Sequence, residues 1–202
     1  MTDPTTSDAR RVQRVRHEIK RRELQVARVA RISPHFQRVT FAGEALADFI
    51  SASFDDHVKL ILADGQGEPA MRDYTPRRHD AAARELDIEF ALPAVARRLE
   101  ELPAGTRAIV RLAVADPADR RALASKAAFD LQWLDSDDAL LAATRALALP
   151  PGEGYAWCAA EAASAAALRR VLVDEKGHDR HAIRAAAYWK RGAAAHHENL
   201  DG

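Results

Sequence analysis

The chain has 202 residues, of which 30 are Lys or Arg and 30 are Asp or Glu, so its formal net charge at pH 7 is zero. This length suits one large domain or two small ones, and the balanced charge excludes a generic polyanion-binding protein such as a non-specific nucleic-acid binder. The single cysteine, Cys158, excludes an intrachain disulfide, and no apolar run reaches the roughly 20 residues of a membrane span.

The N-terminal segment is polar and basic. Residues 1–15 begin "MTDPTTSDAR" and have no apolar signal core, so we expect a disordered tail and a soluble, cytoplasmic protein. From Arg10 to Arg38 there are ten Lys or Arg residues and two acids. This excess fits a solvated basic arm and first strand, or a surface that faces an anion.

Short strands dominate the chain up to Leu92. Strands are predicted in "RRELQVARVARIS", which has the β-branched content of a strand but imperfect alternation, in "HFQRVTFAG" and in "RDYTPR". Clean alternation of apolar and polar residues predicts two more in "HVKLIL" and "ELDIEFAL". In "HVKLIL", for example, Val58, Leu60 and Leu62 share one face and Lys59 the other. Several short strands joined by turns predict a small antiparallel β-barrel.

After Leu92 the pattern changes to alternating helices and strands. Pro93 is typical of a first helical turn, Ser136 of a helix N-cap, and Gly177 of a helix end. Strands are predicted in "TRAIVRLAVA", "FDLQWL", "GYAWCAA" and "AIRAAAYW". Strand-helix-strand alternation favours an α/β domain with a parallel sheet, and we place the boundary between residues 16–92 and residues 93–202.

Several segments together resemble the siderophore-interacting protein family. They are "VRHEIKRRELQVARVARISPHFQRVTFAGEALADF", "DDHVKLIL", "RDYTPR", "GYAWCAAEAASAAALRRVL" and "AAYWKRG". The resemblance implies a two-domain α+β flavoprotein with an N-terminal FAD-binding antiparallel barrel and a C-terminal NAD(P)H-binding α/β domain. It also implies an FAD-dependent oxidoreductase, which passes electrons from NAD(P)H or a ferredoxin through FAD to siderophore-bound Fe(III) and releases Fe(II). No protein-bound metal is implied.

The element "RDYTPR" is the main candidate for the flavin site. An arginine can bind a phosphate bidentately, and a tyrosine offers a ring contact and a hydroxyl group. By resemblance, Arg72 contacts the phosphate, Tyr74 the ring or ribityl chain, and Thr75 the ring edge, while Arg77 is a weaker candidate. The alternative is an ordinary cationic edge strand.

Five further residues are assigned by the same resemblance. Lys59 would form a basic, siderophore-binding cluster with Lys190 and Arg191, or else be a solvated lysine. Glu161 would lie near the nicotinamide, or else cap the following helix. Trp189 would pack near the domain interface or over the flavin.

One part of the family pattern is absent. "EFAL" passes directly into "LPAVARRLEEL", without the helix start that would place N–H groups on the FAD pyrophosphate. We infer an internal deletion at Leu92–Pro93, after which the first strand of the α/β sheet is missing or is supplied by residues 85–92. We expect an incomplete barrel, weak FAD binding or a homodimer that covers the gap. The alternative function is a catalytically impaired remnant, or a module that binds siderophore or a partner.

Overall fold

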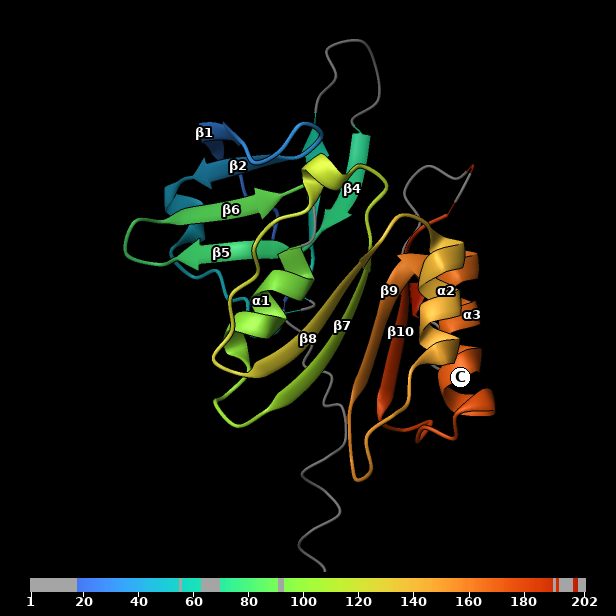
Figure 1. The fold of residues 1–202 in the computed structure, drawn as a ribbon. Helices are drawn as coiled ribbons and strands as arrows, with labels where there is room; N and C mark the ends of the chain where they lie inside the picture. The colour runs from blue at the N-terminus through green and yellow to red at the C-terminus, as the bar shows by residue number, and fades with distance from the viewer. Residues whose placement is uncertain are drawn as a thin grey trace, which may run out of the picture. The chain divides into compact units, whose positions relative to one another are not determined.

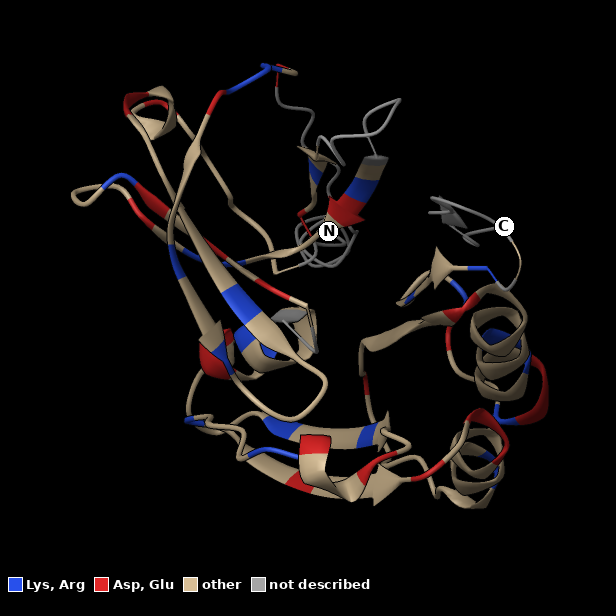
Figure 2. Cartoon of the chain, turned by 90° about the horizontal axis from the view of Figure 1, so that it is seen from above, with Lys and Arg blue, Asp and Glu red and all other residues tan. Residues whose placement is uncertain are grey.

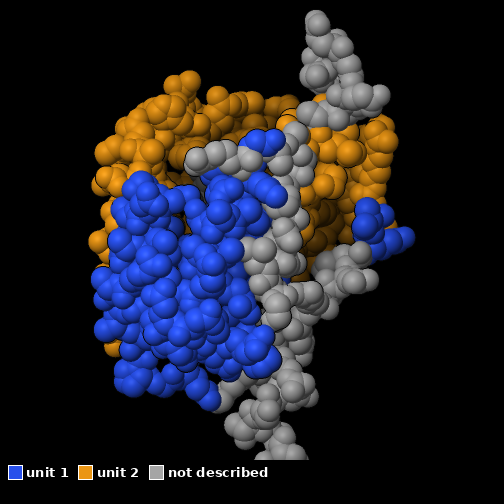
Figure 3. Space-filling model, turned by 90° about the vertical axis from the view of Figure 1, so that its right-hand side faces the viewer, with its two compact units in different colours: residues 1–19, 136–202 blue, residues 20–135 orange. Residues whose placement is uncertain are grey.

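The computed structural model describes residues 18–54, 56–62, 70–90, 93–190, 192 and 198–199. The chain divides into two compact units, one of residues 20–135 and one of residues 1–19 with 136–202 (Figure 3). Figure 1 labels the main helices and strands along the chain. No helix in the described ranges is long and apolar enough to cross a membrane.

A four-stranded antiparallel sheet is the main element of residues 20–135 (Figure 1). Its order is β1-β2-β6-β5, and its strands are β1 (Gln25–Arg31), β2 (Gln37–Ala42), β5 (Pro76–Asp80) and β6 (Glu85–Glu89). One face is apolar, with Phe41, Leu86 and Ile88 buried beside Leu46 of a 3₁₀ turn, Glu44–Leu46. The alternation in "ELDIEFAL" therefore predicted the core side of β6 correctly.

The opposite face of this sheet is polar and partly buried. Arg28 of β1 is in register with Thr40 of β2, Thr40 with Asp87 of β6, and Asp87 with Arg78 of β5. The Asp87 carboxylate accepts hydrogen bonds from Thr40 Oγ1 at 2.6 Å and from Arg78 Nε at 2.9 Å. Figure 2 shows basic and acidic residues interspersed along the strands of this unit rather than segregated. The charges are therefore mutually compensated across the sheet.

Next to this row lies a second, more deeply buried carboxylate. The side chain of Glu89 is fully buried, and its Oε1 accepts from Arg38 Nε at 2.9 Å. Arg121 Nη1 lies 2.7 Å from Oε2, but no N–H points at that oxygen, so the contact is an ion pair rather than a hydrogen bond. Arg77 Nε is 3.7 Å from Oε1. Three guanidinium groups thus surround one carboxylate.

The predicted single strand in "RDYTPR" is two strands. β4 (Ala70–Tyr74) pairs with β3 (Val58–Leu62), whereas β5 starts at Pro76 and pairs with β6. The chain changes pairing partner at Thr75 because Pro76 has no backbone N–H for a continuing ladder. Arg72 and Tyr74 therefore lie on a different strand pair from Arg77.

The rest of this unit begins with α1 (Pro93–Glu101), which starts at Pro93 as predicted. A pair of parallel strands follows, β7 (Arg107–Ala113) and β8 (Ala128–Leu134), joined through a 3₁₀ turn at Pro117–Asp119. Parallel strands were predicted for this part of the chain, but β7 and β8 form a two-stranded sheet separate from the sheet of the later strands.

The second unit contains a β-α-β arrangement with α2 beside α3 (Figure 1). Its elements are α2 (Asp137–Ala146), β9 (Ala156–Glu161), α3 (Ala162–Arg170), a π-helical turn (Val171–Glu175), β10 (Ile183–Trp189) and β11 (Glu198–Asn199). β10 runs parallel to β9 and antiparallel to β11. The Ser136 side chain caps α2 by accepting from the Ala139 amide. Gly177, at φ 69°, ends the π-turn, as predicted.

The expected combination of an antiparallel sheet with parallel strands is confirmed, but no closed barrel forms among the described strands. In the sequence, one boundary between the compact units falls between Asp135 and Ser136, whereas the domain bounds 16–92 and 93–202 remain predictions. The strand within residues 85–92, β6, pairs with β2 and β5, and both alternatives for the first strand of the α/β sheet remain predictions. The junction residues 91 and 92 lie outside the described ranges.

Candidate functional site

The β3–β4 pair carries three of the predicted site residues. The register places Lys59 opposite Asp73, Leu60 opposite Arg72, and Val58 opposite Tyr74. Directly opposed residues share a face, so Arg72 and Tyr74 lie on the side of Val58 and Leu60, and Lys59 lies on the other side. Asp73 lies on the same side as Lys59, opposite to Arg72 and Tyr74.

Tyr74 is a half-buried aromatic residue at the end of β4. Its ring packs edge-on against Phe90, with ring centroids 4.5 Å apart and an interplanar angle of 66°. Burial raises the pKa of the Tyr74 hydroxyl, and the charge of Arg72 offsets part of this effect. The hydroxyl is therefore protonated at neutral pH, and it can donate a hydrogen bond to a ligand.

Arg72 is exposed, and its Nη1 donates to the Met71 carbonyl at 2.8 Å. A guanidinium group has five N–H donors in a planar fork, so this bond leaves donors for a further acceptor. The next site residue, Thr75, is 95% buried at the corner between β4 and β5. An anion that approached this corner would meet Arg72 before it met Thr75.

Lys59 forms an ion pair that the sequence did not indicate. Its Nζ lies 2.8 Å from Asp73 Oδ1. The contact depends on the antiparallel register of two strands that are separated by residues 63–69 in the sequence. The Lys59 side chain is half-exposed, and its charge is locally balanced by Asp73.

Arg77 is held by acidic side chains of its own unit. It forms a bidentate pair with Glu100 of α1, with an Nη1–Oε2 distance of 2.8 Å, and it also lies beside Glu89. An open pocket of about 400 Å³ adjoins it, lined by Arg38, Arg77, Arg78, Asp87, Arg97, Glu100 and Glu101. Arg77, Arg78 and Arg97 pair with the three acids of this lining, and Arg38 pairs with Glu89, so the charges of the pocket are locally compensated.

Two predicted residues of the second unit lie in register at the ends of parallel strands. Glu161 of β9 is the pairing partner of Trp189 of β10, and this carboxyl edge is where open α/β sheets bind ligands. The Glu161 side chain accepts from the Ala163 amide at 2.7 Å, so it caps α3, as the structural alternative predicted. Trp189 is 50% exposed, and the exposed Lys190 follows it.

The basic cluster remains a prediction. Lys59 belongs to one compact unit and Lys190 to the other, and Arg191 lies outside the described residues. The roles assigned to Arg72, Tyr74, Thr75, Arg77, Glu161 and Trp189 likewise stay predictions.

Sequence comparison matches two related family models. The model "Siderophore-interacting protein" matches residues 89–192, just over half of the chain, and the model "Siderophore-interacting FAD-binding domain" matches residues 25–70. Arg72 to Arg77 lie between these ranges.

Two curated relatives cover most of the chain. The NADPH-dependent ferric-chelate reductase of Escherichia coli K12 is 29% identical over 245 residues, which covers 88% of this chain and 96% of the relative. The ferric vibriobactin reductase ViuB of Vibrio cholerae is 26% identical over 251 residues, which covers 88% of this chain and 93% of the relative. Both alignments contain more positions than this chain has residues, so each relative has segments without a counterpart here.

A solved structure has the same fold. The siderophore utilization protein from T. fusca superposes with a TM-score of 0.78 at 28% identity, covering 86% of this chain and 94% of that one. Together with the family model that spans just over half of the sequence, this likeness shows that the chain belongs to the siderophore-interacting protein family.

Proposed function

We propose that this chain is a flavin-dependent ferric-siderophore reductase that takes electrons from NAD(P)H and delivers them to siderophore-bound Fe(III). Family membership carries the proposal. The names of the E. coli and V. cholerae relatives favour ferric-chelate reduction, and the former favours NADPH over a ferredoxin as the donor.

The residues of the β3–β4 pair fit a flavin by their chemistry. Arg72 offers an exposed guanidinium group for a phosphate, Tyr74 offers a protonated hydroxyl group and an aromatic ring, and Thr75 offers a hydroxyl group at the corner. When bound, FAD would supply the conversion of a two-electron hydride donor into single-electron transfers. Arg77 fits less well, because a phosphate would have to displace Glu100.

In the proposed reaction, residues of the first unit bind the flavin and residues of the second unit bind the nicotinamide. Arg72 would anchor the cofactor by a charge-assisted bidentate contact, and the Tyr74 ring, fixed by Phe90, would give one wall of the site. In the second unit, the carboxyl edge that bears Glu161 and Trp189 would bind the nicotinamide. Reduction of Fe(III) to Fe(II) weakens its binding to hard oxygen donors, which would release the metal.

A second candidate is a non-catalytic module that binds siderophore without flavin. The segments present in the relatives but without a counterpart here favour it, as does the inferred loss of the pyrophosphate-binding helix start. Both candidates predict binding of ferric chelates, but only the reductase requires FAD.

The test is an FAD titration of the purified chain followed by an assay of NADPH-driven Fe(III) reduction, with a ferrous-specific chelator as the reporter. The reductase predicts FAD binding and NADPH-dependent Fe(II) formation. Arg72→Leu should weaken FAD binding by about 10- to 100-fold, the value of one hydrogen-bonded charge contact. Arg31→Leu, which removes another exposed arginine, on β1, should leave FAD binding unchanged. Absence of FAD binding together with binding of a ferric catecholate would refute the reductase in favour of the module.

A further inference from the structure

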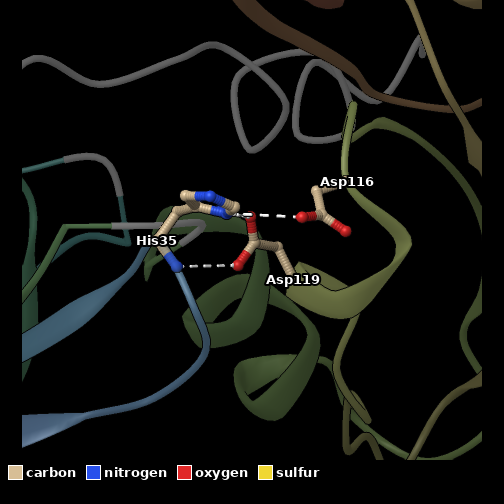
Figure 4. Close-up of side chains that lie close together, drawn as sticks. All are labelled: His35, Asp116 and Asp119. Carbon is tan, nitrogen blue, oxygen red and sulfur yellow. Dashed lines mark hydrogen bonds and ion pairs between the residues drawn. The ribbon is translucent and has the colours of Figure 1, made fainter.

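A histidine and two aspartates of the unit formed by residues 20–135 lie close together, and none of them belongs to the residues predicted to bind flavin. His35 lies in the turn between β1 and β2, and Asp116 and Asp119 lie in the turn that follows β7 (Figure 4). His35 Nδ1 is 2.8 Å from Asp119 Oδ2 and 3.6 Å from Asp116 Oδ2. The ligand atoms of all three residues lie within 4.8 Å of one another.

Each carboxylate is oriented by a donor on its other oxygen. Asp119 Oδ1 accepts from Ser33 Oγ at 2.6 Å and from the His35 amide at 3.2 Å. Asp116 Oδ1 accepts from the Ala118 amide at 2.8 Å. The second oxygen of each aspartate is thereby directed toward the imidazole, which is how metal-binding carboxylates are fixed by their outer partners.

The spacing of the three atoms suits a small metal ion. Bonds of about 2.0–2.2 Å in tetrahedral geometry place neighbouring ligand atoms about 3.3 Å apart. The two measured separations, 2.8 and 3.6 Å, lie on either side of this value. Small rotations about the side-chain bonds would adjust these two separations, and the ligand atoms of all three residues lie within 4.8 Å of one another.

The three residues differ in exposure, so one ligand is held inside the protein and two are accessible to solvent. Asp119 is 95% buried, whereas the side chains of His35 and Asp116 are 62% and 44% exposed. An ion could therefore enter from solvent and keep water in its remaining positions. The imidazole nitrogen distinguishes this set from an acidic patch, because nitrogen donors favour transition metals over Mg²⁺ and Ca²⁺.

We propose that His35 Nδ1, Asp116 Oδ2 and Asp119 Oδ2 bind one divalent first-row transition-metal ion, with the ring proton of His35 on Nε2. The ion would join the β1–β2 turn to the turn after β7, two segments about 80 residues apart in sequence. The proposal does not depend on flavin or on ferric-chelate reduction, and it adds a resident metal to a chain for which none was expected.

The test is calorimetric titration of the full chain with Zn²⁺, and with Co²⁺ as a visible-absorption probe at wavelengths beyond the flavin band. The parent protein should carry His196→Ala and His197→Ala, because two adjacent histidines could bind Zn²⁺ in competition with the proposed site. We expect one equivalent of Zn²⁺, no binding of Ca²⁺ at the same concentration, and Co²⁺ bands typical of a mixed nitrogen and oxygen set.

Variants separate a metal site from a hydrogen-bonded contact. His35→Gln and Asp116→Asn should each weaken Zn²⁺ binding at least tenfold, Ser33→Ala should weaken it about tenfold by releasing Asp119, and the control His57→Gln should not change it. Circular dichroism and the melting temperature check folding, and the exposed Asp116 gives the mildest variant. Equal Zn²⁺ affinity of the parent and Asp116→Asn, or no Zn²⁺ binding by a folded parent, would overturn the proposal. Lower melting temperatures without altered metal binding would show a structural hydrogen-bond contact only, and would equally overturn it.

Discussion

Replacing Glu89 by Gln tests whether its buried charge stabilises the antiparallel sheet. The Glu89 side chain is fully buried, and the guanidinium groups of Arg38, Arg77 and Arg121 surround it. The side chains of Arg77 and Arg121 are each only 19% exposed. Glutamine keeps the size of the side chain but removes the negative charge, so these cations lose their compensation.

The expected loss of stability follows from burial. Removing one partner of a buried ion pair typically costs about 3–5 kcal/mol, because the remaining charge cannot be rehydrated. Arg38 is 42% exposed and can turn to solvent, so we expect the lower end, about 3 kcal/mol. With a urea m-value of about 2 kcal/mol/M, this loss lowers the unfolding midpoint by about 1.5 M.

The assay is urea denaturation followed by circular dichroism, with hydrogen exchange of the β2 and β6 peptides as a local readout. Glu100→Gln is the matched control, because Glu100 also pairs with Arg77 but its side chain is 42% exposed. Exposed pairs contribute at most about 1 kcal/mol. Equal midpoint shifts for Glu89→Gln and Glu100→Gln would refute the argument from burial.

Three further outcomes are expected. Burial lowers the pKa of His79, and the charge of Asp80 partly offsets this effect. The ring is therefore neutral in the folded chain but takes up a proton in the unfolded chain below about pH 6.5, the pKa of an unfolded histidine. The free energy of unfolding should therefore decrease as the pH falls through about 6.5. The His79→Phe variant should lose less stability over this pH range. If the stability of the two proteins fell equally with pH, His79 would not be the group responsible. Burial raises the pKa of Cys158 to about 12, so a thiol reagent at pH 7 should modify it only after unfolding, and rapid labelling of the native chain would contradict this. Asp73→Asn releases Lys59 and should strengthen binding of an anionic ferric chelate by up to about fivefold at low salt, whereas an unchanged affinity would exclude Lys59 from the substrate site.

Sequence reasoning located most elements because their signals are local. Pro93, Ser136 and Gly177 act within one helical turn, and the structure shows each at the helix end where it was expected. The alternation in β6 likewise identified Leu86 and Ile88 as core residues. Such signals depend on backbone geometry that neighbouring residues impose.

The errors and omissions concern pairing between distant segments. The division of "RDYTPR" at Thr75 depends on β4 and β5 having different partners. The Lys59–Asp73 pair depends on strand register, and the burial of Glu89 depends on arginines from three separate segments. An isolated sequence does not specify these partners, so a polar residue in a strand is easily taken as exposed.

The row of Arg28, Thr40, Asp87 and Arg78 across four strands has a consequence for folding. Side chains alternate between the two faces of a strand, so a shift of one residue in β6 would turn Asp87 of this row toward the apolar face that holds Leu86 and Ile88. This misalignment would bury a charge without a partner. The misaligned chain would therefore be unstable and would rearrange early in folding. The row therefore encodes strand alignment, and we expect its four positions to change together rather than singly when related sequences diverge.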